Sequence, residues 1–165
     1  MRIIAGVARG RRIESPAGWS TRPTLDRVRE NLFNILSPRM PDAAFLDLFA
    51  GTGANGLEAV SRGAARAVLV DNDPAAVAVI RKNIALCGFS ERVQCQRLGL
   101  PGGLDRISGP FDVVFADPPY AFADAGALLR GLDAGHLMAP GGIIVYESAR
   151  KMPPPCSSRP RNCFC

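Results

Sequence analysis

The stretch Phe45-Leu-Asp-Leu-Phe-Ala-Gly-Thr-Gly-Ala-Asn-Gly56 decides the fold of this chain. A short apolar run leads into a Gly-x-Gly-x-x-Gly turn, and the helix that starts at Leu57 is closed by Gly63. Glycines at the carboxyl end of a strand let the backbone approach a ligand closely. This strand–turn–helix unit therefore predicts an α/β fold with a ligand site at the turn.

The alternation of strands and helices continues along the chain. We expect strands near 45–50, 67–71, 93–97, 111–116 and 142–147, and helices near 24–36, 54–62, 74–87 and 124–134. This order predicts a mostly parallel, doubly wound, Rossmann-like sheet with right-handed crossovers. A ligand then belongs outside the carboxyl ends of the strands.

Two acidic residues accompany the glycine-rich turn. Asp47 lies inside the preceding strand, and Asp71 ends the next strand, 20 residues after Gly51, where an acid normally accepts hydrogen bonds from ribose hydroxyls. A nicotinamide dehydrogenase shows the same glycines but has no need of Asp47. S-adenosylmethionine carries a ribose, a transferable methyl and an ammonium group for which Asp47 is a counter-ion. A plainer interpretation, which the presence of Asp71 disfavours, is that turn N–H groups satisfy the Asp47 carboxylate.

A second motif, Asp117-Pro-Pro-Tyr120, follows the apolar run 111–116. Neither proline has an N–H to donate, so the hydrogen bonding of the strand stops there. The Asp117 carboxylate and the Pro118 carbonyl become two acceptors for an exocyclic amino group, and Tyr120 can stack on the ring that bears it. A tight turn alone would explain the prolines but not the acid and the aromatic. The motif predicts a pocket for the amino group of a planar base.

Bulk composition limits the class of protein. A chain of 165 residues with 47% hydrophobic and 21% charged residues is typical of one soluble domain. No apolar run approaches the roughly 18 residues of a membrane span, and no signal-peptide pattern follows Arg2. We therefore expect a cytoplasmic protein without membrane contact. The cysteine spacing favours no zinc site, and we expect no metal.

Charge is distributed unevenly along the chain. Residues 1–39 hold eight arginines against three acids, a local charge of +5, whereas residues 40–148 hold eight basic and twelve acidic groups, a local charge of −4. A basic arm on an acidic body suggests phosphate contact confined to one surface. A solvated helix face with incidental arginines is the alternative.

The helix of the basic arm has a recognisable pattern. Its apolar stripe consists of Leu25, Val28, Leu32 and Leu36. Thr24 is a candidate N-cap. Arg27 lies opposite the stripe and Arg29 at its edge, so Arg27 is expected to reach solvent or phosphate.

These motifs resemble those of the RsmD-type methyltransferases, which are small-subunit ribosomal RNA (guanine-N2)-methyltransferases. The similarity covers residues 1–148 and includes Thr21-Arg-Pro-Thr24, Asp26-Arg-Val-Arg-Glu30, the glycine-rich stretch and Asp117-Pro-Pro-Tyr120, in the same order and spacing. The N-terminal signature is the more specific part, since DNA and other RNA amino-methyltransferases share the Asp-Pro-Pro-Tyr box. The resemblance implies a class I S-adenosylmethionine-dependent methyltransferase fold.

The resemblance also implies roles for individual residues. The expected cofactor contacts are Asp47, Phe49, Gly51, Gly53, Gly56, Asp71 and Asn72. The expected catalytic residues around the target amine are Asp117, Pro118, Pro119 and Tyr120. The expected contacts to substrate RNA are Arg22, Arg27 and Arg29.

The chain departs from the family pattern at two places. Where the family tends to place an Asp or Asn for the adenine amino group, this chain has Arg97, which can stack on adenine but cannot accept its N–H. Where relatives continue with an antiparallel strand pair, residues 149–165 form an irregular Pro-, Cys- and Arg-rich tail. Its four prolines disfavour a regular central strand, so we expect one domain over 1–148, a missing strand pair and an open sheet edge at 143–146.

The predicted reaction is methyl transfer from S-adenosylmethionine to the exocyclic N2 amine of a guanine. The expected partner is ribosomal RNA or the small ribosomal subunit, and the protein is expected to be a monomer. The target base must leave its stack, so base flipping or a single-stranded target is required. Two alternatives stay open: an amino-methyltransferase acting on adenine or cytosine of DNA, and a non-catalytic, truncated RNA-binding remnant.

Overall fold

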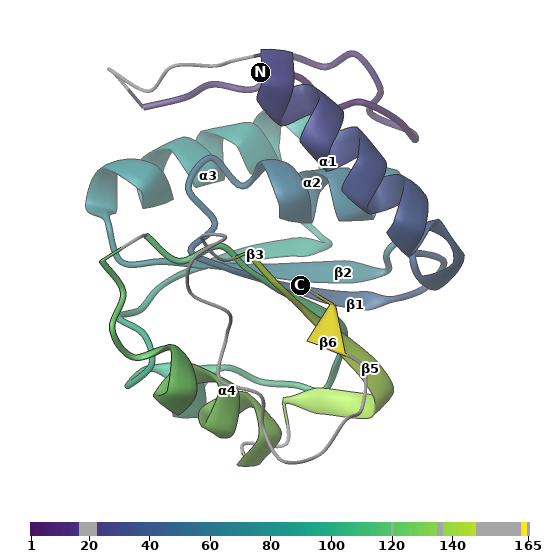
Figure 1. Ribbon diagram of the computed structural model, residues 1–165. Helices are drawn as coiled ribbons and strands as arrows, with labels where there is room; N and C mark the ends of the chain where they lie inside the picture. The colour runs from purple at the N-terminus through teal and green to yellow at the C-terminus, as the bar shows by residue number, and fades with distance from the viewer. Residues whose placement is uncertain (17–22, 120, 135–136, 148–162, 165) are drawn as a thin grey trace.

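A central β-sheet organises the molecule (Figure 1). The computed structural model describes residues 1–16, 23–119, 121–134, 137–147 and 163–164. Within these residues the sheet has six strands in the order β3-β2-β1-β4-β5-β6, and all neighbouring pairs are parallel. The strands are β1 (Ala44–Leu48), β2 (Arg66–Asp71), β3 (Val93–Arg97), β4 (Phe111–Ala116), β5 (Met138–Tyr146) and β6 (Cys163–Phe164).

Helices cover both faces of this sheet. The α-helices are α1 (Pro23–Leu36), α2 (Ala54–Ser61), α3 (Pro74–Cys87) and α4 (Ala125–Ala134), with 3-10 turns η1 (Ser37–Arg39) and η2 (Leu104–Arg106). Figure 1 shows α1, α2 and α3 on one side of the sheet and α4 on the other. The predicted parallel, doubly wound α/β fold is confirmed. The strand order reverses between β1 and β4, which is where such sheets bind ligands.

Local chemistry explains where the elements begin and end. Asp73 caps α3 by accepting the N–H of Ala75 at 2.9 Å, and Pro74 occupies the first helical position, where it needs no N–H partner. Gly63 follows the end of α2 with φ 114°, a conformation that favours glycine. The structure thus confirms Gly63 as the helix end expected from the sequence.

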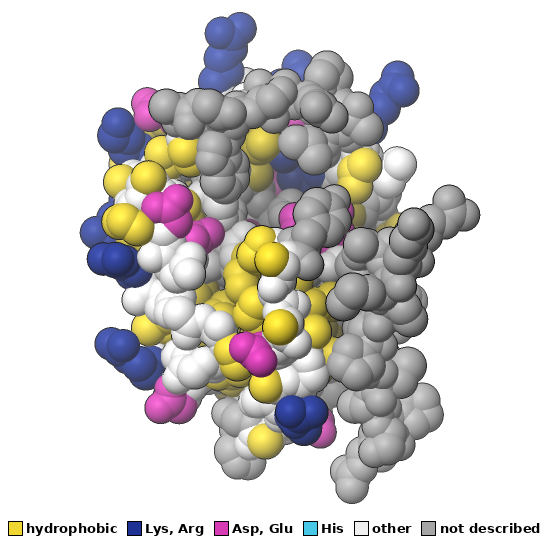
Figure 2. Space-filling view, turned by 60° about the vertical axis from the view of Figure 1, so that its left-hand side comes forward, with side chains coloured by type: hydrophobic (Ala, Val, Ile, Leu, Met, Phe, Trp, Pro, Cys, Tyr) yellow, Lys and Arg dark blue, Asp and Glu magenta, His cyan; other side chains and the backbone are white. Residues whose placement is uncertain are grey.

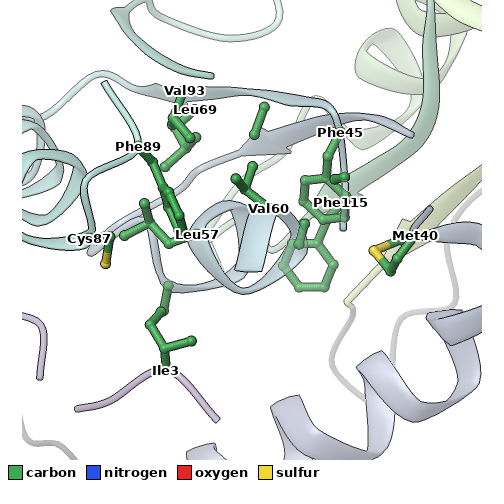
Figure 3. Close-up of a cluster of buried hydrophobic side chains, with 14 of the residues drawn as sticks. Ile3, Met40, Phe45, Leu57, Val60, Leu69, Cys87, Phe89, Val93 and Phe115 are labelled. Atoms are coloured by element: carbon green, nitrogen blue, oxygen red, sulfur yellow. The ribbon is translucent and has the colours of Figure 1, made fainter. Parts of the chain in front are cut away.

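Each face of the sheet buries its own hydrophobic cluster. On the α2 side, Leu57 and Val60 pack against Phe45 and Phe115 of the sheet (Figure 3). On the α4 side, Leu128 belongs to a second cluster that includes sheet residues of β1, β2, β4 and β5. A fully buried leucine or phenylalanine stabilises a fold by about 1.5–3 kcal/mol, so the two clusters hold the strand ends in fixed positions.

The N-terminal segment is hydrogen-bonded to α2. The fully buried Glu58 accepts the backbone N–H groups of Ile4 at 2.7 Å and Ala5 at 3.0 Å. An antiparallel bridge joins Arg2 to Arg12. The basic arm therefore begins on the same helix that the glycine-rich turn opens.

The helix of the basic arm differs from its predicted orientation. Phe33 and Leu36 are buried, but Val28, assigned to the apolar stripe, is 52% exposed. The buried face instead includes Arg29, which hydrogen-bonds to the backbone of the N-terminal segment. The helix begins at Pro23, so Thr24 lies in its first turn and the N-cap assignment is wrong.

The end of the chain contributes a short strand. Cys163 and Phe164 pair with Ile144 and Val145 of β5, so the described part of the tail covers an edge that the sequence predicted to be open. All four prolines of the tail precede this pair, which leaves its N–H groups able to donate. Residues 148–162 of the tail lie outside the described residues. None of the helices that the structure describes has the length and apolar character that crossing a bilayer requires.

Candidate active site

Four acidic residues meet at the carboxyl ends of the strands. Asp47 is in β1, Asp71 ends β2, and Asp117 and Glu147 directly follow β4 and β5. Because Asp47 pairs with Phe115 and side chains alternate between faces, Asp117 shares the face of Asp47. Figure 2, which turns the left-hand side of Figure 1 forward, shows hydrophobic side chains near the middle of this view, most Lys and Arg side chains toward its edges and acidic side chains in both places.

The glycine-rich turn is held in a conformation that few residues tolerate. Gly51 and Gly53 have φ of 58° and 77°, and Phe49, although not a glycine, has φ of 64°. A non-glycine residue in this region costs about 1–3 kcal/mol and is typical of ligand-binding loops. The Phe49 ring lies edge-on to Phe122 with centroids 5.0 Å apart. The turn is therefore preformed next to the Asp117 loop.

The Asp71 carboxylate fixes this turn. Its Oδ2 accepts the N–H of Gly51 at 2.8 Å, and its Oδ1 accepts the N–H of Asp73 at 2.9 Å. Each carboxylate oxygen has a second lone pair, so ribose hydroxyls can still donate to it. Asp71 thus joins the two loops that would flank a nucleoside.

Asp47 has an unsatisfied oxygen. The side chain is fully buried, its Oδ2 accepts the N–H of Gly56 at 3.0 Å, and its Oδ1 has no hydrogen-bond partner among the described residues. Burial raises the pKa of Asp47 to about 7, the Gly56 N–H lowers it, and the nearby Asp117 and Asp71 carboxylates raise it. A buried carboxylate is stable in its charged form only when paired. The site therefore fits a ligand that brings a cation or a hydrogen-bond donor.

Gly56 has a different role from the expected cofactor contact. It is buried, and a Cβ at this position would come within 2.8 Å of Leu69 Cδ1. Because Gly56 has no side chain, α2 can pack closely on β2. The Gly56 N–H donates a hydrogen bond to Asp47. The glycine therefore packs against β2 and positions the Asp47 carboxylate.

The Asp117 loop is more open. Asp117 is exposed, yet the protein around its carboxyl removes water and raises the pKa of the group to about 6, to which the Glu147 carboxylate contributes. Pro118 is partly buried and Pro119 exposed, and the Pro119 carbonyl accepts the Phe122 N–H at 2.8 Å. Tyr120 lies outside the described residues. The structure thus brings Asp117 to the same end of the sheet as Asp47.

The chain is similar to known proteins along most of its length. The family model described as Conserved hypothetical protein 95 matches residues 1–159. Ribosomal RNA small subunit methyltransferase D of Escherichia coli is 39% identical over 150 residues, which cover 90% of this chain and 74% of the relative. The chain belongs to this RsmD family of methyltransferases. The relative of the same name from Haemophilus influenzae is 35% identical over 158 residues, covering 93% of this chain and 81% of the relative.

The same relationship holds in three dimensions. The solved yhhF protein of Escherichia coli matches this methyltransferase with a TM-score of 0.84 and 37% identity, covering 94% of this chain and 85% of that one. The protein TTHA0928 of Thermus thermophilus matches with a TM-score of 0.78 and 37% identity, covering 92% and 88%. The family membership and the Rossmann-like fold expected from the motifs are both confirmed.

Arg97 and Asn72 lie together next to Asp71. Arg97 ends β3, paired with Asp71, and its Nε donates to the Asn72 carbonyl at 3.2 Å. Both residues are exposed. The guanidinium is thereby held next to the Asp71 loop, where it could stack on a flat ring.

Of the expected RNA contacts, Arg27 and Arg29 have opposite surroundings. Arg27 is exposed. Arg29 is only 5% exposed, and its Nη2 donates to the Arg2 carbonyl at 2.7 Å and to Asp26 at 2.9 Å. A buried guanidinium with these partners cannot reach phosphate, so the assignment of Arg29 to RNA is wrong. Arg22 lies outside the described residues.

Two residues of the site were missed by the sequence analysis. Glu147 lies beside Asp117, although the sequence marks it only as a polar end to an apolar strand. The fully buried Asn83 donates to the carbonyls of Thr52 at 2.9 Å and Glu14 at 3.0 Å, which connects the glycine-rich turn to the N-terminal segment. An amide between Ile80 and Ile84 of an apolar helix was the available signal.

Proposed function

We propose that this methyltransferase transfers the methyl group of S-adenosylmethionine to the exocyclic N2 amine of a guanine in small-subunit ribosomal RNA. One observation carries the proposal: the unsatisfied Asp47 carboxylate and the Asp117 loop occupy the same face, at the point where the strand order reverses. A donor ligand and an amine target thereby meet at one edge of the sheet. The relatives' names support ribosomal RNA as the substrate class.

The cofactor half would hold S-adenosylmethionine through groups that the structure has already positioned. Asp47 would be the counter-ion for an ammonium, since its buried Oδ1 has no hydrogen-bond partner and a charged donor would satisfy it. The backbone of the turn from Phe49 to Gly53 lies alongside the ligand, and Asp71 and Asn72 take the ribose. When bound, the cofactor supplies a sulfonium-activated methyl group.

The target half would orient the amine. The Asp117 carboxylate and the Pro118 carbonyl accept the N–H groups of the amine, which aims its lone pair, and Tyr120 holds the base flat. Positioning would account for most of the rate enhancement. The sulfonium already activates the methyl group, so the protein only has to hold the amine in line with it. The raised pKa of Asp117, about 6, suits it to accept the proton that the amine releases.

Exposed arginines of the N-terminal arm would supply the affinity for RNA. Arg27 is the described residue of the expected set that faces solvent, and the first 39 residues carry a local charge of +5. Phosphate contacts of this kind position a nucleic acid without reading its sequence. We further propose that the protein acts as a monomer in the cytoplasm, on ribosomal RNA or on the assembled small subunit.

The test is transfer of labelled methyl from S-adenosylmethionine, followed by nucleoside analysis. Small-subunit ribosomal RNA, the assembled subunit and DNA are offered separately, with the Asp117→Ala protein as the control. N2-methylguanosine from either RNA substrate is the expected product. Methylated adenine or cytosine in DNA would replace this proposal with the DNA alternative, and binding without transfer would favour the non-catalytic remnant.

A further inference from the structure

Glu147 is held beside Asp117 by the main chain. Ala116 and Tyr146 are paired residues of the parallel strands β4 and β5. The Glu147 N–H donates to the Ala116 carbonyl at 2.9 Å, which extends the pairing one residue beyond β5. The side chains of Asp117 and Glu147 therefore leave neighbouring strand ends on the same face.

Among the residues that the structure describes, no side chain of opposite charge pairs with either carboxylate. Neither has a hydrogen bond or an ion pair with any side chain that the structure describes, and both residues are exposed. The Glu147 carboxylate is close enough to raise the pKa of Asp117, so the two groups repel each other. Asp47, with its buried unpartnered Oδ1, lies on the same face. The two exposed carboxylates and the buried Oδ1 of Asp47 thus lie at the carboxyl end of the sheet, and none of them accepts a hydrogen bond from a described side chain.

The edges of the bases differ in how they would meet this pair. Guanine presents two adjacent donors, the ring N1–H and the exocyclic N2 amine. Adenine and cytosine each present an amine next to a ring nitrogen that accepts hydrogen bonds, and a carboxylate, which only accepts, is repelled by that nitrogen. Enzymes that act on extruded bases read this edge by hydrogen bonds.

We propose that Glu147 accepts the N1–H of the target guanine while Asp117 holds its N2 amine, and that this second contact selects guanine over bases with an acceptor at that position. The inference rests on the proposed function, since it takes guanine as the target. It assigns to Glu147 a specificity role that is separate from the orientation of the reacting amine.

The experiment compares two RNA substrates that both carry the N2 amine. One contains guanine at the modified position, and the other contains 2-aminopurine, whose N1 is an acceptor. The native protein should show a kcat/KM for the guanine RNA about 10- to 100-fold above that for the 2-aminopurine RNA. This ratio is the expected effect of losing one hydrogen bond to a charged group. In Glu147→Gln the amide can donate to N1 of 2-aminopurine, so the ratio should fall close to one.

Two further variants separate specificity from structure. Glu147→Asp keeps the carboxylate and should keep the preference for guanine, with a lower rate. Glu91→Gln makes the same charge change at an exposed residue just before β3, at the opposite edge of the sheet, and should leave the ratio unchanged. Melting temperatures of all variants are measured alongside.

An unchanged guanine preference in Glu147→Gln, or an equal loss on both RNAs, would overturn the role of Glu147 while leaving guanine methylation intact. If the native protein methylates neither RNA, the proposed function fails as well. The two failures are therefore distinguishable.

Discussion

The cofactor half and the target half of the site obtain their hydrogen-bond donors from different sources. On the cofactor half, both oxygens of Asp71 and one oxygen of Asp47 accept backbone N–H groups from the chain itself. On the target half, Asp117 and Glu147 are exposed and have no described side-chain partner. The first half is preorganised by folding, whereas in our proposal the second obtains its donors from the base that it binds. This difference predicts that mutations in the two halves have separable effects.

The largest expected effect is that of Asp117→Ala. The rate of methyl transfer should fall by about 100-fold or more. A displacement of the reacting amine by about an ångström is sufficient for a loss of rate of this size. Affinity for S-adenosylmethionine should stay within a few-fold, because Asp117 lies on the target half. Single-turnover transfer and calorimetric titration of the cofactor measure the two quantities.

The matched variant is Asp71→Ala, which should weaken cofactor binding by about 10- to 100-fold. A loss of this size is expected when a hydrogen bond to a charged group is removed. If Asp117→Ala and Asp71→Ala lose the same cofactor affinity, the two halves are not separable.

The next effect is the pH dependence that Asp47 confers on the cofactor-free protein. Burial raises its pKa from 3.8 to about 7, so the unfolded chain ionises more readily than the folded one. The free energy of unfolding should therefore fall as pH rises from about 4 to about 7, by up to about 4 kcal/mol. Asp47→Asn should flatten this dependence and weaken cofactor binding. Denaturant titrations at several pH values test both proteins, and parallel pH profiles would contradict the assignment.

Gly56→Ala tests whether this glycine packs or binds. The added Cβ would meet Leu69 at 2.8 Å, so the free energy of unfolding should fall by about 1–3 kcal/mol. Gly99→Ala is the control, because a Cβ there meets nothing within 4 Å. Thermal unfolding of the cofactor-free proteins measures the difference. Equal stability of the two variants would show that α2 and β2 adjust to the extra methyl.

The smallest expected effect is that of Arg27, and the other described arginine of α1, Arg29, provides a contrast. Arg27→Ala should leave the melting temperature unchanged and reduce the slope of log affinity against log salt for RNA by roughly one unit, the value of one phosphate contact. Arg29→Ala should instead lower the melting temperature, since it removes buried contacts to Arg2 and Asp26. Fluorescence titrations at several salt concentrations provide the slopes. An unchanged slope in Arg27→Ala would show that this side chain is only part of a solvated face.

The sequence by itself determined the features that depend on neighbours along the chain. The alternation of apolar runs and helical patterns predicted the strands from β1 to β5 and the four α-helices, because period and capping are local properties. The Gly51 turn and the Asp117 motif were legible for the same reason, since glycine and proline restrict the backbone wherever they occur. These signals were sufficient for the fold class and for the family.

Only the tertiary structure decided which side chains face the site and which ones instead stabilise the structure around it. Arg29 is buried because Arg2, which is far away in the sequence, brings its carbonyl to α1. Gly56 packs on Leu69 and its N–H donates to Asp47, so it supports the position of the Asp47 carboxylate. Glu147 stands beside Asp117 because two strands pair in register. Such placements depend on contacts between remote segments, and a pattern read along one chain carries no record of them.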